Sequence, residues 1–249
     1  MTIAAGGGAT VLGPKSPLGR RVTHGSGHGS LGRRIARGSG EALITAGLIV
    51  LLFAIYEVYG RASEVNAHQG QLSRQLDRLW AQTPSSGGGI ATVAAEAPRS
   101  GDAIARLYIP VLRLHWVVVE GVAPNDIEYA PGHYPGTAMP GEVGNFAVAG
   151  HRIPPLFWNL QDVHPRDEIV VETATEWYVY RVTVNEIVSP HAIRVIAPVP
   201  DQPGALANVP SLTLTTCNPK WNDYQRMVVH AVLITSVPRS AGPPVSLGS

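Results

Sequence analysis

The hydrophobic positions of this chain form one long apolar run, followed by a series of short segments separated by glycines and prolines. The run covers the 18 positions from Ala42 to Tyr59 and contains a single acidic residue, Glu57, near its end. A helix of that length extends about 27 Å, just enough to cross a hydrocarbon core of about 30 Å. We therefore predict a transmembrane helix over residues 42–59.

The next segment, residues 60–101, combines a helical spacer with a flexible linker. Leu72, Leu76 and Leu79 recur at helical spacing, which predicts that the helix continues to about Trp80. A structural spacer or a self-association face would each account for these leucines. The stretch from Thr83 to Gly101 is rich in glycine, serine and alanine, a composition typical of flexible linkers.

Residues 102–237 carry the pattern of an all-β domain. Runs of alternating or β-branched apolar residues predict strands at Ile104–Ile109, Leu112–Val119, Asn145–Gly150, Glu168–Glu172, Trp177–Val188, Ser211–Thr216 and Arg226–Ile234. Prolines lie between these runs, where they remove no ladder hydrogen bonds, and helices are expected only as short pieces. Seven or eight strands in about 136 residues are typical of one closed or nearly closed β-barrel. Residues 238–249 are expected to form a disordered tail.

Charge is divided at the apolar run. The formal net charge of +1 combines six basic residues and one acid up to Glu41 with 13 basic and 17 acidic residues after it. Residues 1–41 are rich in glycine and serine and are expected to form a disordered cytoplasmic tail, because basic residues directly before an apolar run favour the cytoplasmic side. The barrel would then lie outside the cell. A cleaved signal peptide ending near residues 60–62 is the alternative, which the long leader disfavours.

Composition narrows the possible chemistry. The near-neutral total charge argues against a general nucleic-acid binder. The single cysteine, Cys217, excludes an intramolecular disulfide framework and any cysteine-rich metal site. It ends an apolar strand and is followed by Asn218-Pro219, so its thiol is expected at the rim of the barrel. A lone cysteine is usually a small, buried hydrophobic residue. Outside the cell, however, an unpaired thiol is easily oxidised, so the presence of Cys217 there favours a functional role for it.

Thiol chemistry requires a nearby base or cation and a proton donor for the leaving group. Among nine histidines, His151 closes a strand directly after a glycine and can share one rim of a barrel with Cys217, whereas His133 is expected to be a structural hydrogen-bonding residue. Arg226 opens the strand after Cys217 and could stabilise an oxyanion at the same rim. Arg152 competes with Arg226 for this role.

These motifs together resemble the sortases, membrane-anchored cysteine transpeptidases of Gram-positive surfaces. The resemblance is carried by Thr213-Leu-Thr-Thr-Cys217, by Ala149-Gly-His151-Arg152 and by the downstream Arg226. The stretch Pro131-Gly-His-Tyr-Pro-Gly-Thr137 is most like class E, the housekeeping type of high-GC actinobacteria.

The resemblance implies a sortase-like barrel of about eight strands with three catalytic residues at its rim, each with a separate role. Cys217 would attack the Thr–Gly carbonyl of a C-terminal LAxTG- or LPxTG-type sorting signal and form a thioacyl intermediate. His151 would act as general acid and then base, and Arg226 would hold the oxyanion. The partners implied are surface proteins that carry the sorting signal and an amine of a cell-wall peptidoglycan precursor. By the same resemblance Tyr134, Thr215 and Thr216 would bind the substrate; for Tyr134, packing on the prolines around it is the alternative.

No metal and no cofactor are expected, because paired loop acids such as Asp126 and Glu128 are usually only solvated. Three alternatives remain: another extracytoplasmic cysteine peptidase, an L,D-transpeptidase, or an inactive membrane-tethered binding barrel. In L,D-transpeptidases the histidine and cysteine usually lie close in sequence, whereas 66 positions separate His151 from Cys217.

Overall fold

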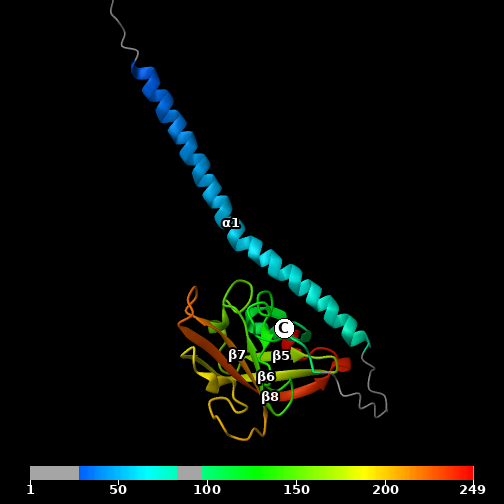
Figure 1. Cartoon of the computed structure of the whole chain (residues 1–249). Helices are drawn as coiled ribbons and strands as arrows, with labels where there is room; N and C mark the ends of the chain where they lie inside the picture. Colours follow the sequence, from blue (N-terminus) through cyan, green and yellow to red (C-terminus); the bar gives the residue numbers. More distant parts are fainter. Residues whose placement is uncertain (1–27, 83–96, 249) are drawn as a thin grey trace, which may run out of the picture. The chain divides into compact units, whose positions relative to one another are not determined.

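The computed structural model describes residues 28–82 and 97–248. A single helix, α1 (His28–Gln82), precedes the β-barrel (Figure 1). The chain divides into two compact units at residues 52 and 53, so the first part of α1 belongs to one unit and the rest of the helix to the barrel unit. Residues 28–41, expected to be disordered, belong to α1; no proline occurs between Pro17 and Pro84 to interrupt its hydrogen-bond ladder.

The apolar part of α1 has the length and composition of a membrane span. The window Ser39–Tyr56 has a mean hydropathy of 1.9, and no part of it is buried within the protein. It overlaps most of the predicted span, residues 42–59. One N-terminal apolar helix of this kind fits a single membrane anchor.

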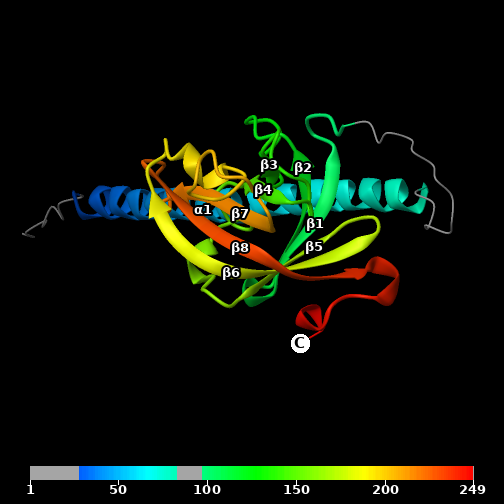
Figure 2. The ribbon, with the colours of Figure 1, turned by 90° about the horizontal axis from the view of Figure 1, so that it is seen from below.

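Eight strands form a closed barrel, which confirms the predicted fold class. They are β1 (Ala103–Ile109), β2 (Leu114–Glu120), β3 (Gly132–His133), β4 (Gly144–Ala149), β5 (Glu168–Glu172), β6 (Glu176–Val188), β7 (Pro210–Asn218) and β8 (Gln225–Pro238). Their order around the barrel is β1-β2-β3-β4-β7-β8-β6-β5. The pairs β2·β3 and β4·β7 are parallel and the others antiparallel. Figure 2 shows β8 between β6 and β7.

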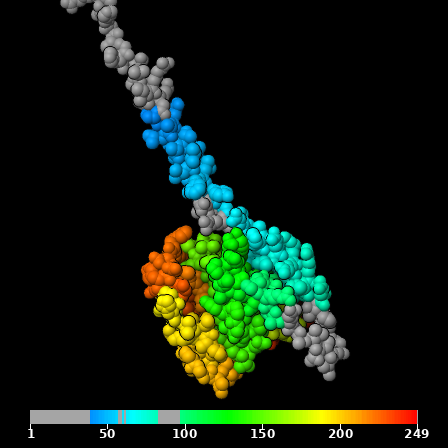
Figure 3. All heavy atoms as spheres, in the orientation of Figure 1, coloured from blue at the N-terminus to red at the C-terminus, as the bar shows by residue number. Residues whose placement is uncertain are grey.

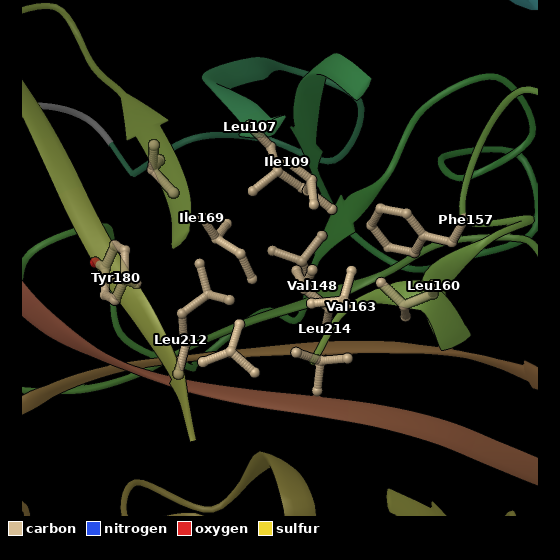
Figure 4. Close-up of a cluster of buried hydrophobic side chains, with 14 of the residues drawn as sticks. Leu107, Ile109, Val148, Phe157, Leu160, Val163, Ile169, Tyr180, Leu212 and Leu214 are labelled. Atoms are coloured by element: carbon tan, nitrogen blue, oxygen red, sulfur yellow. The ribbon is translucent and has the colours of Figure 1, made fainter. Parts of the chain in front are cut away.

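Inward-facing side chains fill the barrel. Positions along β1 alternate between buried and partly exposed, as expected for a strand with one face on the core, whereas every residue of β4 is buried. Figure 4 shows side chains from several strands that meet in the interior, among them Leu107, Val148, Ile169 and Leu214. The helical pieces are single 3₁₀ turns: Pro110–Leu112, Leu160–Asp162, Ile193–Ile196, Arg239–Ala241 and Val245–Leu247.

The second part of α1 packs against the barrel (Figure 3). Leu76 is 1% exposed and lies with Trp80 against Val117 of β2, while Leu72 is partly buried beside them. The Gln69 amide forms hydrogen bonds to both backbone groups of Val117, accepting from its N–H at 2.7 Å and donating to its carbonyl at 3.2 Å. The predicted leucine stripe therefore contacts the barrel itself, with Leu79 at its exposed edge.

The C-terminal residues are ordered where a disordered tail was expected. Arg239 Nε donates to Glu172 Oε1 at 2.7 Å, and Leu247 packs against the cluster around Trp177. Glu172 is 3% exposed and also accepts hydrogen bonds from Tyr108 and Arg106. This buried carboxylate therefore needs several donors, and Arg239 from the C-terminal segment is one of them. The partner residues lie 67 positions apart in the sequence, which is why local composition did not reveal the contact.

Candidate active site

Cys217 and His151 lie at the same rim of the barrel because of the register of β4 and β7. Parallel pairing places Ala149 beside Thr215, and the Gly150 N–H continues the ladder by donating to the Thr215 carbonyl at 3.0 Å. Two residues beyond this pair the chain reaches His151 on one side and Cys217 on the other, and both residues line the same cavity. The sequence-predicted pair is therefore brought together.

The position of His151 is fixed by its neighbours. The Thr216 hydroxyl donates to the Gly150 carbonyl at 2.8 Å, and the His151 carbonyl accepts from the Phe157 N–H at 3.1 Å. A Cβ atom at Gly150 would lie 2.6 Å from the Phe157 ring, so only glycine fits between this ring and β7. Thr216 is 3% exposed, and its hydroxyl positions the backbone before His151.

A cavity of about 370 Å³ opens at this rim. It is lined by residues 151–153, Cys217 and residues 221–223 of the β7–β8 turn. Cys217 is half-buried in it. Burial lowers the pKa of His151 below its ordinary value, and the nearby Glu128 carboxylate opposes this effect by favouring the imidazolium.

Arg226 is the cross-strand neighbour of Cys217 on β8. Its Nη1 group donates to the Asp223 carbonyl at 2.6 Å and to the Gln225 carbonyl at 2.9 Å, so the guanidinium lies along the β7–β8 turn that lines the cavity. The third sequence-predicted residue thus occupies the strand next to Cys217, on the side opposite to His151.

Arg152, the competing arginine, is bound into the protein. It is 8% exposed; its Nη1 donates to the Cys217 carbonyl at 3.2 Å and to Asn218 Oδ1, and its Nη2 donates to Gln161 Oε1 at 2.7 Å. Burial lowers its pKa, while the nearby Cys217 raises it. These bonds suit a residue that holds the end of β7, which leaves Arg226 as the better candidate for contact with a substrate.

Tyr134 and Thr215 meet although 81 positions separate them. The Tyr134 hydroxyl and Thr215 Oγ1 lie 3.1 Å apart, which links the turn after β3 to the strand that carries Cys217. His133 beside it is 2% exposed, with Nδ1 2.7 Å from Glu120 Oε2 and Nε2 2.8 Å from Thr137 Oγ1. This agrees with the structural hydrogen-bonding role expected for His133.

An aromatic pair at the mouth of the site was not among the residues predicted from the sequence. Trp221, which lines the cavity and is 83% exposed, packs edge-on against Trp158 with ring centroids 4.9 Å apart. Lys220 Nζ lies 4.3 Å from the centre of the Trp158 ring and donates to Asn159 Oδ1. Their positions in two different loops carry no periodic pattern; the only sequence indication was that Trp221 follows Cys217 closely.

Metal-ligand atoms come together elsewhere in the barrel. Within residues 28–82 and 97–248, the one group of three or more suitable side chains consists of Glu186, Asp201 and His230. Asp126 and Glu128, the loop acids considered from the sequence, are not part of this group. Asp126 instead accepts hydrogen bonds from the Ala123 N–H and the Ser100 hydroxyl.

Comparisons with known proteins agree with this geometry. A family model described as a sortase domain matches residues 107–234. Sortase SrtE1 of Streptomyces coelicolor is 32% identical over 219 residues, which cover 84% of this chain and 60% of that protein, so the chain spans less than two thirds of this relative's length.

Solved structures give the same picture. The SrtA sortase from Actinomyces oris is similar at 38% identity with a TM-score of 0.56, over 59% of this chain and 88% of that one. Sortase E1 from Streptomyces coelicolor, crystallised with a tripeptide in the active site, is similar at 34% identity with a TM-score of 0.55, over 61% and 99% of the two chains.

Proposed function

Because the chain belongs to the sortase family and is class E-like, we propose that it is a cysteine transpeptidase that cleaves a C-terminal sorting signal and joins the protein to an amine. The observation that supports this proposal is that His151, just after β4, and the half-buried Cys217 of the neighbouring strand β7 line one cavity. Arg226, next to Cys217 on β8, supplies the third group that acyl transfer needs.

The proposed reaction proceeds in two halves. The Cys217 thiolate attacks the carbonyl carbon of the Thr–Gly bond, and Arg226 stabilises the resulting oxyanion. His151 then gives its proton to the glycine amine, the C–N bond breaks, and a thioester remains on Cys217. An incoming amine attacks this thioester, His151 takes the proton from that amine, and the thiolate leaves as the new amide bond forms.

The bound sorting signal would lie along the cavity beside Tyr134 and Thr215. The Tyr134 hydroxyl lies 3.1 Å from Thr215 Oγ1 on the strand that carries Cys217, so the partly exposed Tyr134 would contact an LAxTG- or LPxTG-type peptide and the buried Thr215 would position its hydroxyl. Thr216 would act indirectly, through the Gly150 carbonyl. The acceptor would be an amine of a cell-wall precursor.

Membrane topology completes the proposal. The segment Ser39–Tyr56 would anchor the chain, with the basic residues before it in the cytoplasm and the barrel outside. In this arrangement the cavity at Cys217 faces the compartment in which surface proteins and cell-wall precursors meet.

The test uses the full chain in detergent micelles with an LAxTG peptide and an LPxTG peptide, each with and without an amine. Cleavage between Thr and Gly, a peptide-sized mass increase on Cys217 and an amine-dependent ligated product are expected by mass spectrometry. A scrambled peptide of the same composition is the control. If the folded protein forms no acyl adduct with either peptide, the transpeptidase assignment is wrong; hydrolysis without any ligated product would favour a cysteine peptidase.

Replacing Arg226 with lysine is expected to lower kcat/KM by about 10²- to 10³-fold, because a point charge does not reproduce the planar donor fork of a guanidinium. Arg181→Lys is the matched control, since Arg181 is half exposed on β6 and pairs with Glu168. Peptide cleavage rates measured for both variants check this prediction. Near-normal rates for Arg226→Lys would move the oxyanion role to Arg152 or to backbone amides.

A further inference from the structure

Three side chains from separate elements converge on the wall of the barrel formed by β6, β7 and β8. Glu186 belongs to β6, Asp201 to the loop between β6 and β7, and His230 to β8. His230 Nε2 lies 3.4 Å from Asp201 Oδ2 and 3.6 Å from Glu186 Oε1. The three ligand atoms lie within 4.8 Å of one another.

Two of these atoms are buried without a hydrogen bond. The His230 side chain is 7% exposed, and its Nε2 has no hydrogen-bond partner among the described residues; the same holds for Glu186 Oε1. Buried polar atoms without a partner are costly and rare in folded proteins, so a pair of them aimed at one point indicates a missing ligand.

The hydrogen bonds behind His230 determine where its lone pair points. The Asn145 amide group donates to the carbonyls of Val195 and Ala197, so its oxygen can only accept, and the Thr213 hydroxyl donates to it at 2.8 Å. With that proton used, Thr213 Oγ1 accepts from the Nδ1–H of His230 at 2.9 Å. In the neutral imidazole, Nε2 then carries a lone pair directed at two carboxylates.

We propose that Glu186, Asp201 and His230 form a Zn²⁺ site. Tetrahedral zinc ligands at 2.0–2.2 Å from the metal lie about 3.3–3.6 Å from one another, and the two distances from His230 Nε2 fall in that range. A hydrogen bond from the other ring nitrogen, here to Thr213, is what orients a metal-binding histidine. Calcium is disfavoured, since it takes six to eight oxygen ligands.

Charge and access both suit a cation. Arg194 Nε donates to Asp201 Oδ1 at 2.9 Å, which fixes this carboxylate and leaves Oδ2 directed at His230. One arginine faces two carboxylates in this cluster, so its formal charge with a neutral histidine is −1. A cavity of about 230 Å³ reaches both Asp201 and His230 and offers a route for the ion.

The site is separate from the proposed reaction. His230 pairs with Thr213, four residues along β7 from Cys217, a separation of about 13 Å. A zinc ion here would join the β6–β7 loop to the barrel wall and would therefore stabilise the folded domain. No sequence motif indicated this site, because positions 186, 201 and 230 follow no metal-binding spacing, and no metal was expected.

The test is a calorimetric titration of the full chain in detergent micelles with ZnCl₂ after removal of metals by a chelator. All proteins carry Cys217→Ala, so that the active-site thiol contributes no zinc binding. One bound equivalent and a higher melting temperature with Zn²⁺ are expected. Asp201→Asn and His230→Gln should each weaken binding at least tenfold and remove the thermal shift, whereas His115→Gln, on an exposed residue of β2, should change neither.

Asp201 is exposed, so its variant is expected to fold even if His230→Gln does not. Absence of saturable Zn²⁺ binding in the parent protein would overturn the proposal. Equal binding by Asp201→Asn and the parent would do the same, as would Ca²⁺ binding as tightly as Zn²⁺. None of these outcomes depends on peptide cleavage, so the zinc site and the proposed transpeptidase activity are tested independently.

Discussion

Replacing Cys217 with alanine is expected to lower peptide turnover by at least about 10³-fold, because the nucleophile of both half-reactions is removed. The chain contains no second cysteine. Besides Cys217, the described side chains at this cavity that could attack a carbonyl are the imidazole of His151 and the carboxylate of Asp223, and both are weaker nucleophiles than a thiolate. The acyl adduct should disappear together with turnover.

Two measurements separate a chemical effect of Cys217→Ala from a structural one. The thiol is half-buried at the rim and its removal opens no space in the core, so circular dichroism and the melting temperature should match those of the parent protein. Alkylation of the parent at its single cysteine should reproduce the loss of activity. Turnover above about a tenth of the parent rate in the folded variant would contradict the assignment of Cys217 as nucleophile.

The barrel was predictable because its strands are separate in the sequence and are rich in β-branched and aromatic residues. Along β1 and the first residues of β6, buried and partly exposed positions alternate, so the sequence of each strand reveals which face is buried. β3 was missed since two residues, Gly132 and His133, are too few for alternation to appear. The ordered C-terminus was missed for another reason: Arg239 is held by Glu172, a partner that only the folded barrel brings near.

The sequence indicated which residues make up the candidate site but not how they are arranged in space. The positions of His151 and Cys217 at strand ends indicated a shared rim, but the parallel register that aligns them depends on contacts between segments 66 positions apart. The role of Gly150 depends on Phe157, because a Cβ atom at position 150 would lie 2.6 Å from the Phe157 ring. Likewise, the choice between Arg152 and Arg226 rests on burial, because Arg152 is buried and donates through both Nη groups, whereas Arg226 is partly exposed and donates through Nη1.

Replacing His151 with alanine is expected to lower kcat/KM by about 10²- to 10⁴-fold, because the leaving amine and the incoming amine both lose their proton partner. His115→Ala is the matched control: it removes an exposed imidazole from β2, outside the cavity at Cys217. Single-turnover rates of acyl-enzyme formation and of aminolysis should both fall for His151→Ala. Loss of only one of the two rates would contradict its dual role as acid and base.

The pH profile connects His151 to its surroundings. The Glu128 charge raises the pKa of His151, which burial lowers, so Glu128→Gln removes the opposing effect and shifts that pKa further down. The limb of kcat/KM on which protonated His151 is lost should therefore move to lower pH in Glu128→Gln. In a His151→Ala background the same substitution should move no limb, because the titrating group is absent. A shift that persists in that background would assign the limb to another residue.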